Sequence, residues 1–316
     1  MKFWQSAMIG LARSKSITGF MQGNRLMRGL AGRFVGGDSS FAAVTRSSEL
    51  NALAATTSLY YLGEYVESPA AIEENVAQLA ATIEQLGQSK LDVHVSIDPT
   101  QIGYAHSDAL GEANALRLGK LIAEQPASGR RRLAMLDMED FSVVQKTLDL
   151  RARMAQAGYP TGITIQAYLH RSGKDLHDLV EAGAAAVRLV KGAYNEPSEI
   201  AFPKKSDVDE NYFHLAQRLL SPEARGAGVR AAIATHDLKL IARIRDWASS
   251  QGIARNRLEF AMLYGIQREE QLRLAREGYR VSVLVSYGSF WFPWFMRRLA
   301  ERPANILFLA KNIFSA

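Results

Sequence analysis

The hydrophobic positions of this chain follow a repeating two-part pattern from about residue 55 to residue 300. A short run of apolar or β-branched residues is followed each time by a longer segment whose apolar residues recur every three or four positions. The first kind of run is typical of a buried strand and the second of an amphipathic helix. The eight runs that we predict as strands are 55–62, 92–97, 132–137, 162–167, 185–190, 230–234, 258–262 and 279–285.

The segments between these runs predict helices, and one further helix, 40–51, precedes the first strand. The predicted helices that follow the strands are 69–87, 106–124, 141–157, 173–182, 208–224, 237–251, 267–277 and 290–301, and the polar 195–207 segment is a long loop. Eight successive strand–helix units in about 250 residues favour an α/β fold of the (β/α)₈ TIM-barrel type. The alternative is a doubly wound open sheet, but the chain contains neither GxGxxG nor GxxxxGK[ST].

The first 35 residues and the rest of the chain differ in net charge. Residues 1–35 contain six basic residues and no acidic residue, so they account for the whole net charge of +6. We interpret 1–50 as an N-terminal helical arm and 51–316 as a single barrel domain, because no linker-like segment divides the chain. The neutral barrel gives no support to nucleic-acid binding. The basic arm is a candidate for contact with an anionic membrane surface.

The composition limits the location and the chemistry further. The chain has 316 residues and no cysteine, which excludes disulfides, thiolate metal sites and a cysteine nucleophile. No apolar run has the ~18–20 residues of a membrane span. We therefore expect a cytoplasmic protein, with a peripheral position at the inner membrane as the alternative that the basic arm raises.

Polar residues gather where the predicted strands end. In a (β/α)₈ barrel the carboxyl ends of the strands surround the active site, so these residues form a candidate site. They are Asp98, Gln101, Asp137, Glu139, Asp140, Gln166, Tyr168, Arg188, Lys191, Tyr194, Thr235, His236, Asp237, Tyr264, Tyr287, Arg297 and Arg298.

Several of these residues allow more than one interpretation. Strand alternation places Arg188 inside the barrel mouth, where a guanidinium needs an anion or an electron-rich ring. Lys191 is a surface lysine, a phosphate contact or the amine of a Schiff-base lyase. Asp137, Glu139 and Asp140 lack recognisable metal-ligand spacing, so we expect no metal.

The stretch after the last predicted strand combines aromatic and basic residues. Arg297 and Arg298 are adjacent on a predicted helix, with Glu301 one turn later and Trp294 one turn earlier. One interpretation is a solvated helix with an Arg297–Glu301 pair. The other is a carboxylate site, because adjacent guanidinium groups bind carboxylates through paired hydrogen bonds.

With these residues in order, the chain resembles the proline dehydrogenase family of FAD-dependent (β/α)₈ barrels. The motifs that carry the resemblance are RFVGG at 33–37, LGE at 62–64, DMED at 137–140, IQAYLHR at 165–171, RLVKGAY at 188–194, ATHD at 234–237, MLYGI at 262–266 and RRLAERPAN at 297–305. They span most of the chain, and RLVKGAY and RRLAERPAN are the most specific.

The resemblance implies a role for each matching residue. FAD would be bound by Gln166, Arg188, Val190, Lys191, Gly192, Ala193, Thr235 and His236. Arg188 would lie beside the flavin N5 edge and, with Asp137, Arg297 and Arg298, would act in catalysis. The substrate would contact Asp98, Asp137, Tyr194, Leu263, Leu284, Trp294, Arg297, Arg298 and Glu301. The substrate would be L-proline or a related cyclic or secondary amino acid, oxidised to the imine, and a quinone or other acceptor would take the electrons.

The chain departs from the family pattern in the substrate pocket. Asp98 stands where the family has lysine, and Leu284 and Trp294 stand where it has tyrosine; Ala261 replaces a glutamine. A lysine-to-aspartate exchange changes the local charge by two units, which is unfavourable for a carboxylate. Three hypotheses therefore remain: an FAD-dependent amine dehydrogenase, a flavin-binding homologue that has lost catalysis and acts as a partner or regulator, and a Schiff-base lyase that uses Lys191.

Overall fold

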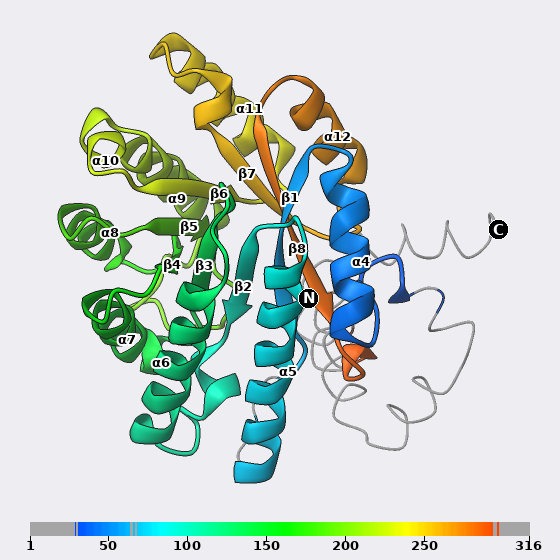
Figure 1. Cartoon of the computed structure of the whole chain (residues 1–316). Helices are drawn as coiled ribbons and strands as arrows, with labels where there is room; N and C mark the ends of the chain where they lie inside the picture. Colours follow the sequence, from blue (N-terminus) through cyan, green and yellow to red (C-terminus); the bar gives the residue numbers. More distant parts are fainter. Residues whose placement is uncertain (1–28, 30, 64–65, 67, 293–295, 297–316) are drawn as a thin grey trace.

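The computed structural model describes residues 29, 31–63, 66, 68–292 and 296. Within them, eight parallel strands form a closed barrel in which each strand pairs with its neighbours in sequence and β8 pairs with β1 (Figure 1). This confirms the (β/α)₈ fold. The strands are β1 Ala55–Tyr61, β2 Val93–Ile97, β3 Arg132–Leu136, β4 Thr161–Gln166, β5 Ala186–Val190, β6 Arg230–Ala234, β7 Glu259–Leu263 and β8 Arg280–Tyr287.

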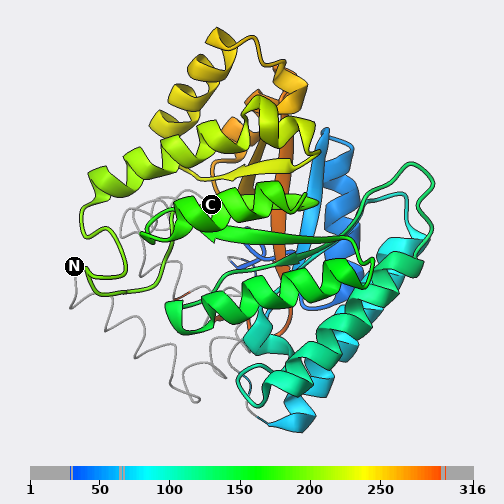
Figure 2. The same cartoon turned by 90° about the vertical axis from the view of Figure 1, so that its left-hand side faces the viewer.

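Helices surround the strands, and Figure 2 shows several of them side by side along the outside of the sheet. They are α4 Ser40–Asn51, α5 Pro69–Gln88, α6 Asp108–Glu124, α7 Val144–Gln156, α8 Ser172–Glu181, α9 Lys205–Leu219, α10 Pro222–Gly226, α11 Leu238–Ser250 and α12 Arg268–Arg276, with short 3₁₀ turns at Pro99–Ile102, Phe141–Val143 and Arg255–Arg257. Serine caps such as Ser68 and Ser107 start α5 and α6 by accepting backbone N–H groups.

Two predicted helices differ from the observed ones for local reasons. The segment that we predicted as one helix, 208–224, is divided into α9 and α10. The Ser221 side chain accepts from Ala224 N, and Pro222 lacks the N–H that would continue α9. The predicted helix 141–157 begins with a 3₁₀ turn because the Asp140 side chain accepts from Ser142 N.

Helix α4 covers the junction of the first and last strands. It packs against β1, β8 and α5, and Figure 1 shows it between α5 and α12. In a regular (β/α)₈ barrel the helix that follows the last strand takes this place. The residues after β8 are therefore not needed to cover this part of the sheet.

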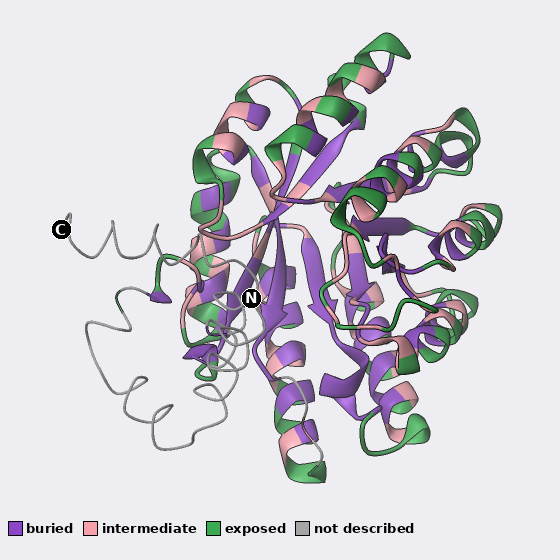
Figure 3. Cartoon of the chain, turned by 180° about the vertical axis from the view of Figure 1, so that it is seen from behind, coloured by how far each residue is buried: buried purple, intermediate pink, exposed green. Residues whose placement is uncertain are grey.

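The two faces of the strands have different surroundings. Outward residues such as Leu59, Val95 and Val283 join the large core between sheet and helices. Figure 3 shows buried strands, and helices that are buried on the side facing the sheet. The barrel interior is more polar, and Leu133, Met135 and Ala186 form a small separate apolar cluster there. An interior of this kind can hold charged groups only where they are paired.

The segment before α4 is held at the carboxyl ends of β7 and β8. Gly36 N donates to Ser286 O at 2.7 Å, and Gly288 N donates to Gly37 O at 3.0 Å. Gly265, after β7, has a φ of +80°, and a Cβ there would overlap the backbone oxygen of Arg33. The close approach of these two segments therefore requires a glycine at position 265.

We expect Gly265→Ala to destabilise the protein by about 2–3 kcal/mol, through backbone strain and the collision with Arg33. The matched control is Gly278→Ala, because Gly278 has a similar φ of +87° but no atom within 4 Å of the place that a Cβ would occupy. Gly278→Ala should therefore lose only the stability that backbone strain costs, about 1 kcal/mol. Thermal unfolding of both variants checks this, and equal losses would contradict the packing of Arg33 on Gly265.

Candidate active site at the barrel mouth

The centre of the candidate site is an ion pair inside the barrel. Arg188 on β5 donates from Nη1 to Oδ1 of Asp137, directly after β3, at 2.6 Å. The same carboxylate oxygen accepts from Thr164 Oγ1 at 2.8 Å. Arg188 is only 7% exposed, so its charge is almost completely removed from solvent. Sequence reasoning placed both residues at the mouth, and the structure brings them together.

Further polar groups line the side of the mouth formed by β1 to β4. Tyr60 Oη donates to Asp98 Oδ2 at 2.6 Å, and both side chains are buried. The amide nitrogen of Gln166 donates to the backbone oxygens of Met138 and Glu139. The Gln166 amide oxygen is buried and has no hydrogen-bond partner among the described residues. This acceptor could receive a hydrogen bond from a bound molecule.

The opposite side of the mouth, formed by β5 to β8, is apolar and open to solvent. Its inward residues are partly exposed although their neighbours along each strand are buried. These residues are Val190, Ala234, Ala261, Leu263 and Leu284. The mouth therefore combines a polar half that contains a buried cation with an accessible apolar half made of small and aliphatic side chains. A flat aromatic ring system with polar edges matches this combination.

The loop after β5 continues the site. Gly192 has a φ of +105°, and a Cβ there would overlap the ring of Tyr168. A glycine at position 192 therefore allows the backbone after β5 to lie against the ring of Tyr168. Ala193 is exposed, and Tyr194 packs against the core at its edge. Burial raises the pKa of Tyr168, so this phenol stays protonated at neutral pH.

Lys191 lies between two carboxylates in the structure. Its Nζ donates to Asp209 of α9 at 2.5 Å and to Asp237 at the start of α11 at 2.8 Å. Lys205 is also bonded to Asp209. A lysine amine that is bonded to two carboxylates is a poor nucleophile, which argues against the Schiff-base lyase. The sequence did not indicate Asp209, which lies on α9, 18 residues after Lys191.

Thr235 and His236 support the loop between β6 and α11. The Thr235 hydroxyl accepts from Asp237 N at 3.1 Å, and His236 Nε2 accepts from Leu263 N at 2.9 Å. His236 is therefore protonated on Nδ1 when neutral and links β7 to this loop. Both residues lie at the mouth, as predicted.

Four residues of the predicted site, Trp294, Arg297, Arg298 and Glu301, lie outside the described residues, as does nearly all of the basic 1–35 segment. The structure also adds four strand residues that the sequence analysis did not place in the site: Tyr60, Thr164, Ser58 and Ser96. The sequence could have indicated these residues, because each is a polar residue at an inward position of a strand.

Asp237 gives a test of the Lys191 cluster through pH. Burial by itself raises the pKa of Asp237, but the hydrogen bond and charge of Lys191 and the N–H groups of α11 lower it to about 2. A carboxyl whose pKa is lower in the folded state stabilises the protein above its unfolded pKa of ~3.9 and loses this effect as the pH falls toward 2. Asp237→Asn keeps a cap for α11 and removes the charge.

We therefore expect Asp237→Asn to lower the thermal midpoint by a few degrees at pH 7, with the difference from wild type disappearing as the pH falls from 4 to 2. Asp178→Asn is the control, because Asp178 pairs with a single exposed lysine, Lys174. Asp178→Asn should have the same thermal midpoint as wild type at pH 7 and at pH 2. A constant difference between Asp237→Asn and wild type from pH 7 to pH 2 would refute the ion-pair explanation.

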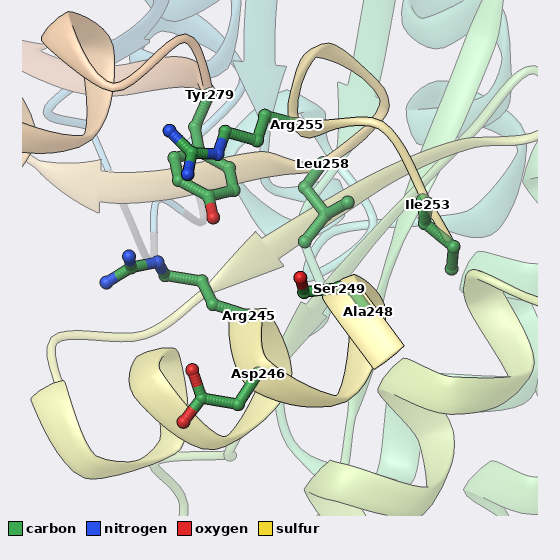
Figure 4. A pocket seen from close by; sticks show the side chains of 8 residues that line it. All are labelled: Arg245, Asp246, Ala248, Ser249, Ile253, Arg255, Leu258 and Tyr279. Carbon is green, nitrogen blue, oxygen red and sulfur yellow. The ribbon is translucent and has the colours of Figure 1, made fainter. Parts of the chain in front are cut away.

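A cavity lies at the other end of the barrel, beside the residues that precede β7 and β8. It has a volume of about 160 Å³ and is lined by Arg245, Arg255, Leu258 and Tyr279 among others (Figure 4). The Tyr279 ring has Arg245 at 5.1 Å and Arg255 at 5.7 Å, and Arg245 is bonded to Glu277. None of the residues that line this cavity is a predicted site residue.

The chain is similar to known proteins along most of its length. A family model described as "Proline dehydrogenase" matches residues 43–311. The chain is 37% identical over 283 residues to "Proline dehydrogenase 2" of Bacillus subtilis subsp. natto, covering 90% of both chains. It is 36% identical over 292 residues to "Proline dehydrogenase" of Deinococcus radiodurans, covering 91% of both.

Solved structures show the same fold in larger proteins. The crystal structure of proline utilization A from Bdellovibrio bacteriovorus, inactivated by N-propargylglycine, aligns with a TM-score of 0.76 and 25% identity. The alignment covers 86% of this chain and 32% of that chain, so the similarity concerns about a third of the larger protein.

Proposed function

The chain belongs to the proline dehydrogenase family, and from this premise we propose that it oxidises L-proline, or a closely related cyclic secondary amino acid, to the cyclic imine with FAD as its cofactor. The enzyme is an oxidoreductase that acts on the CH–NH group of its donor. The observation that carries the proposal is the buried Arg188–Asp137 pair beside an open apolar half of the barrel mouth.

The residues of the mouth fit a flavin. The apolar half offers Val190, Leu263 and Leu284 to a planar ring, and the polar half offers the Arg188 cation and the Gln166 amide oxygen. We propose that Gln166, Arg188, Val190, Lys191, Gly192, Ala193, Thr235 and His236 bind FAD. When bound, a flavin supplies the acceptor for the hydride equivalent that leaves the substrate carbon beside nitrogen.

The chain contributes positioning and electrostatics to this reaction. Arg188 places a buried positive charge where negative charge increases during the reaction, and such charges are most effective when solvent is excluded. Asp137 and Thr164 hold the guanidinium in place. The proton that the substrate nitrogen loses on imine formation leaves to solvent through the open mouth.

Arg297 and Arg298 are the proposed carboxylate ligands, and Trp294, Tyr194 and Glu301 are proposed to complete the pocket. These roles are supported by the RRLAERPAN motif. The contacts of α4 with β1 and β8 also support them, because α4 covers the place that the helix after the last strand takes in a regular (β/α)₈ barrel. We further propose that a quinone or another small acceptor reoxidises the enzyme. No helix among the described residues is both long and apolar enough to cross a membrane.

Asp98 is proposed to reduce the affinity for the substrate carboxylate. Its side chain is buried at the mouth and bonded to Tyr60, so its charge acts through little solvent. We expect Asp98→Lys to raise kcat/KM for L-proline by at least about tenfold, equivalent to about 1.4 kcal/mol. The control is Asp178→Lys, the same charge change on the exposed face of α8. An unchanged or lower kcat/KM in Asp98→Lys would refute this role.

Two observations on purified protein test the proposed function. The protein should carry a flavin with its characteristic visible spectrum, and L-proline should support reduction of an artificial electron acceptor. A panel that includes hydroxyproline, pipecolate, thiazolidine carboxylate and N-methyl amino acids defines the preferred ring. Colourless protein that cannot be loaded with FAD would overturn the cofactor, and flavin that no amino acid of the panel reduces would overturn the activity.

A further inference from the structure

Arg188 reaches across the interior of the barrel to strands that are not its neighbours. β5 pairs with β4 and β6. Nevertheless, Nη2 of Arg188 donates to Ser96 Oγ on β2 at 2.9 Å and to Ser58 Oγ on β1 at 3.4 Å. These bonds are possible only through the middle of the barrel, so one side chain connects β5 with β1 and β2.

Because of the two serines, the Arg188 guanidinium divides its hydrogen bonds between the serine hydroxyls and the Asp137 carboxylate. Their hydroxyls are 3.0 Å apart and hydrogen-bonded to each other, and both side chains are buried. Nη2 is bonded to the serines, whereas Nη1 is bonded to Asp137. A guanidinium beside a carboxylate tends to form two parallel hydrogen bonds to it. The serines compete with Asp137 for the second nitrogen and limit the pair to one close contact.

Toward the amino ends of the strands, below the serines, no carboxylate of the described residues is bonded to Arg188. His94 precedes Ser96 by two positions on the same face of β2 and is 3% exposed. Burial, together with the charges of Arg230, Arg188 and Arg131, holds the pKa of His94 well below its usual value, so the ring is neutral. The nearby acid Glu259 is bound by Arg230 and Arg131. Within the described residues, Asp137 is the one carboxylate bonded to Arg188.

We propose that Ser58 and Ser96 are positioning residues that hold the Arg188 guanidinium across the barrel through neutral hydroxyl groups and so preserve its positive charge for the flavin. Without them Nη2 would turn toward Asp137, and a two-bond ion pair would cancel more of this charge. The inference rests on the proposed function, because the flavin is the group on which the charge acts.

The test uses the flavin-loaded full chain with the double variant Ser58→Ala/Ser96→Ala. The matched control is Ser282→Ala, which removes another buried serine hydroxyl at an inward position, on β8, with no hydrogen bond to Arg188 in the described structure. Three quantities are measured for each protein: the midpoint reduction potential of the bound flavin, kcat and KM for L-proline, and the thermal midpoint.

We expect the double variant to shift the flavin potential to a more negative value and to lower kcat about tenfold, as for the loss of hydrogen bonds to a charged group, with KM changed less than about twofold. Ser282→Ala should match wild type in potential and kcat. A double variant with the potential and kcat of the control would overturn the inference and leave the proposed function intact. If wild type binds no flavin, the proposed function itself fails. If the double variant is insoluble, Ser96→Ala, which removes the shorter bond, is measured against the same criteria.

Discussion

Replacing Arg188 by methionine is expected to lower the rate of flavin reduction by L-proline about 10²–10³-fold, which is typical of removing one preorganised electrostatic contact from an active site. Methionine keeps the approximate length and apolar stem of the side chain but has no charge. The buried Asp137 would lose its partner, and Thr164 would be its remaining donor. The effect should therefore appear in kcat more than in KM, because Arg188 acts on the charge that develops during the reaction.

Arg188→Lys separates charge from geometry in the same position. An ammonium keeps the positive charge. It lacks the two separate nitrogens with which the guanidinium bonds to Asp137 on one side and to Ser58 and Ser96 on the other. We expect an intermediate loss of about tenfold. Stopped-flow reduction under anaerobic conditions gives the rate, and flavin content and thermal midpoint show that both variants are folded. Near-wild-type reduction by Arg188→Met would refute the role of the buried cation.

The second large effect concerns stability at the other end of the barrel. Glu259 is 2% exposed; it forms two hydrogen bonds with Arg230, at 2.7 and 2.5 Å, and is 3.4 Å from Arg131. Glu259→Gln would remove the buried counter-charge of Arg230, whose side chain is 13% exposed, and of Arg131, which costs about 3–5 kcal/mol. We expect the thermal midpoint to fall by about 5–10 °C.

Glu210→Gln is a matched control for this prediction. Glu210 also binds an arginine, Arg243, through two hydrogen bonds of 2.6 and 2.8 Å, but its side chain is 47% exposed. Exposed pairs of this kind contribute about 0–1 kcal/mol, so Glu210→Gln should unfold close to wild type. Differential scanning calorimetry of the two variants compares the same substitution at two levels of burial. Equal thermal midpoints for the two variants would contradict the expected effect of burial on the Glu259 ion pair.

The fold was predictable because its signal is local. Each strand is a short apolar run, each helix has apolar positions at helical spacing, and the eight units follow one another in order. The errors occurred where one or two side chains decide the outcome. Pro222 with its cap Ser221 divides the predicted helix 208–224, and Asp140 converts the start of the predicted helix 141–157 to a 3₁₀ turn.

The candidate site was predictable in its location and less so in its contacts. Strand alternation was sufficient to place Arg188, Asp137 and Gln166 at the mouth. It could not indicate that Arg188 bonds to Ser58 and Ser96, because the three residues lie on strands that are distant in sequence and not adjacent in the sheet. Interactions through the barrel depend on its closure and diameter, which periodicity does not contain.

The arrangement around Lys191 was missed for a related reason. Its partners Asp209 and Asp237 come from the starts of two different helices, and only the packing of α9 beside α11 brings them together. The apolar half of the mouth was also not evident, because Ala234, Ala261 and Leu263 are ordinary core residues by type. Their partial exposure in the folded barrel distinguishes them.

The most direct test of the account is an anaerobic titration of the flavin-loaded protein with L-proline, followed by its visible absorbance. The account predicts that proline bleaches the flavin with a stoichiometry of about one per active site, and that one equivalent of the cyclic imine appears. Bound flavin that is reduced by light or dithionite but by neither L-proline nor any other cyclic amino acid would contradict it. That result would indicate a flavin-binding homologue without dehydrogenase activity.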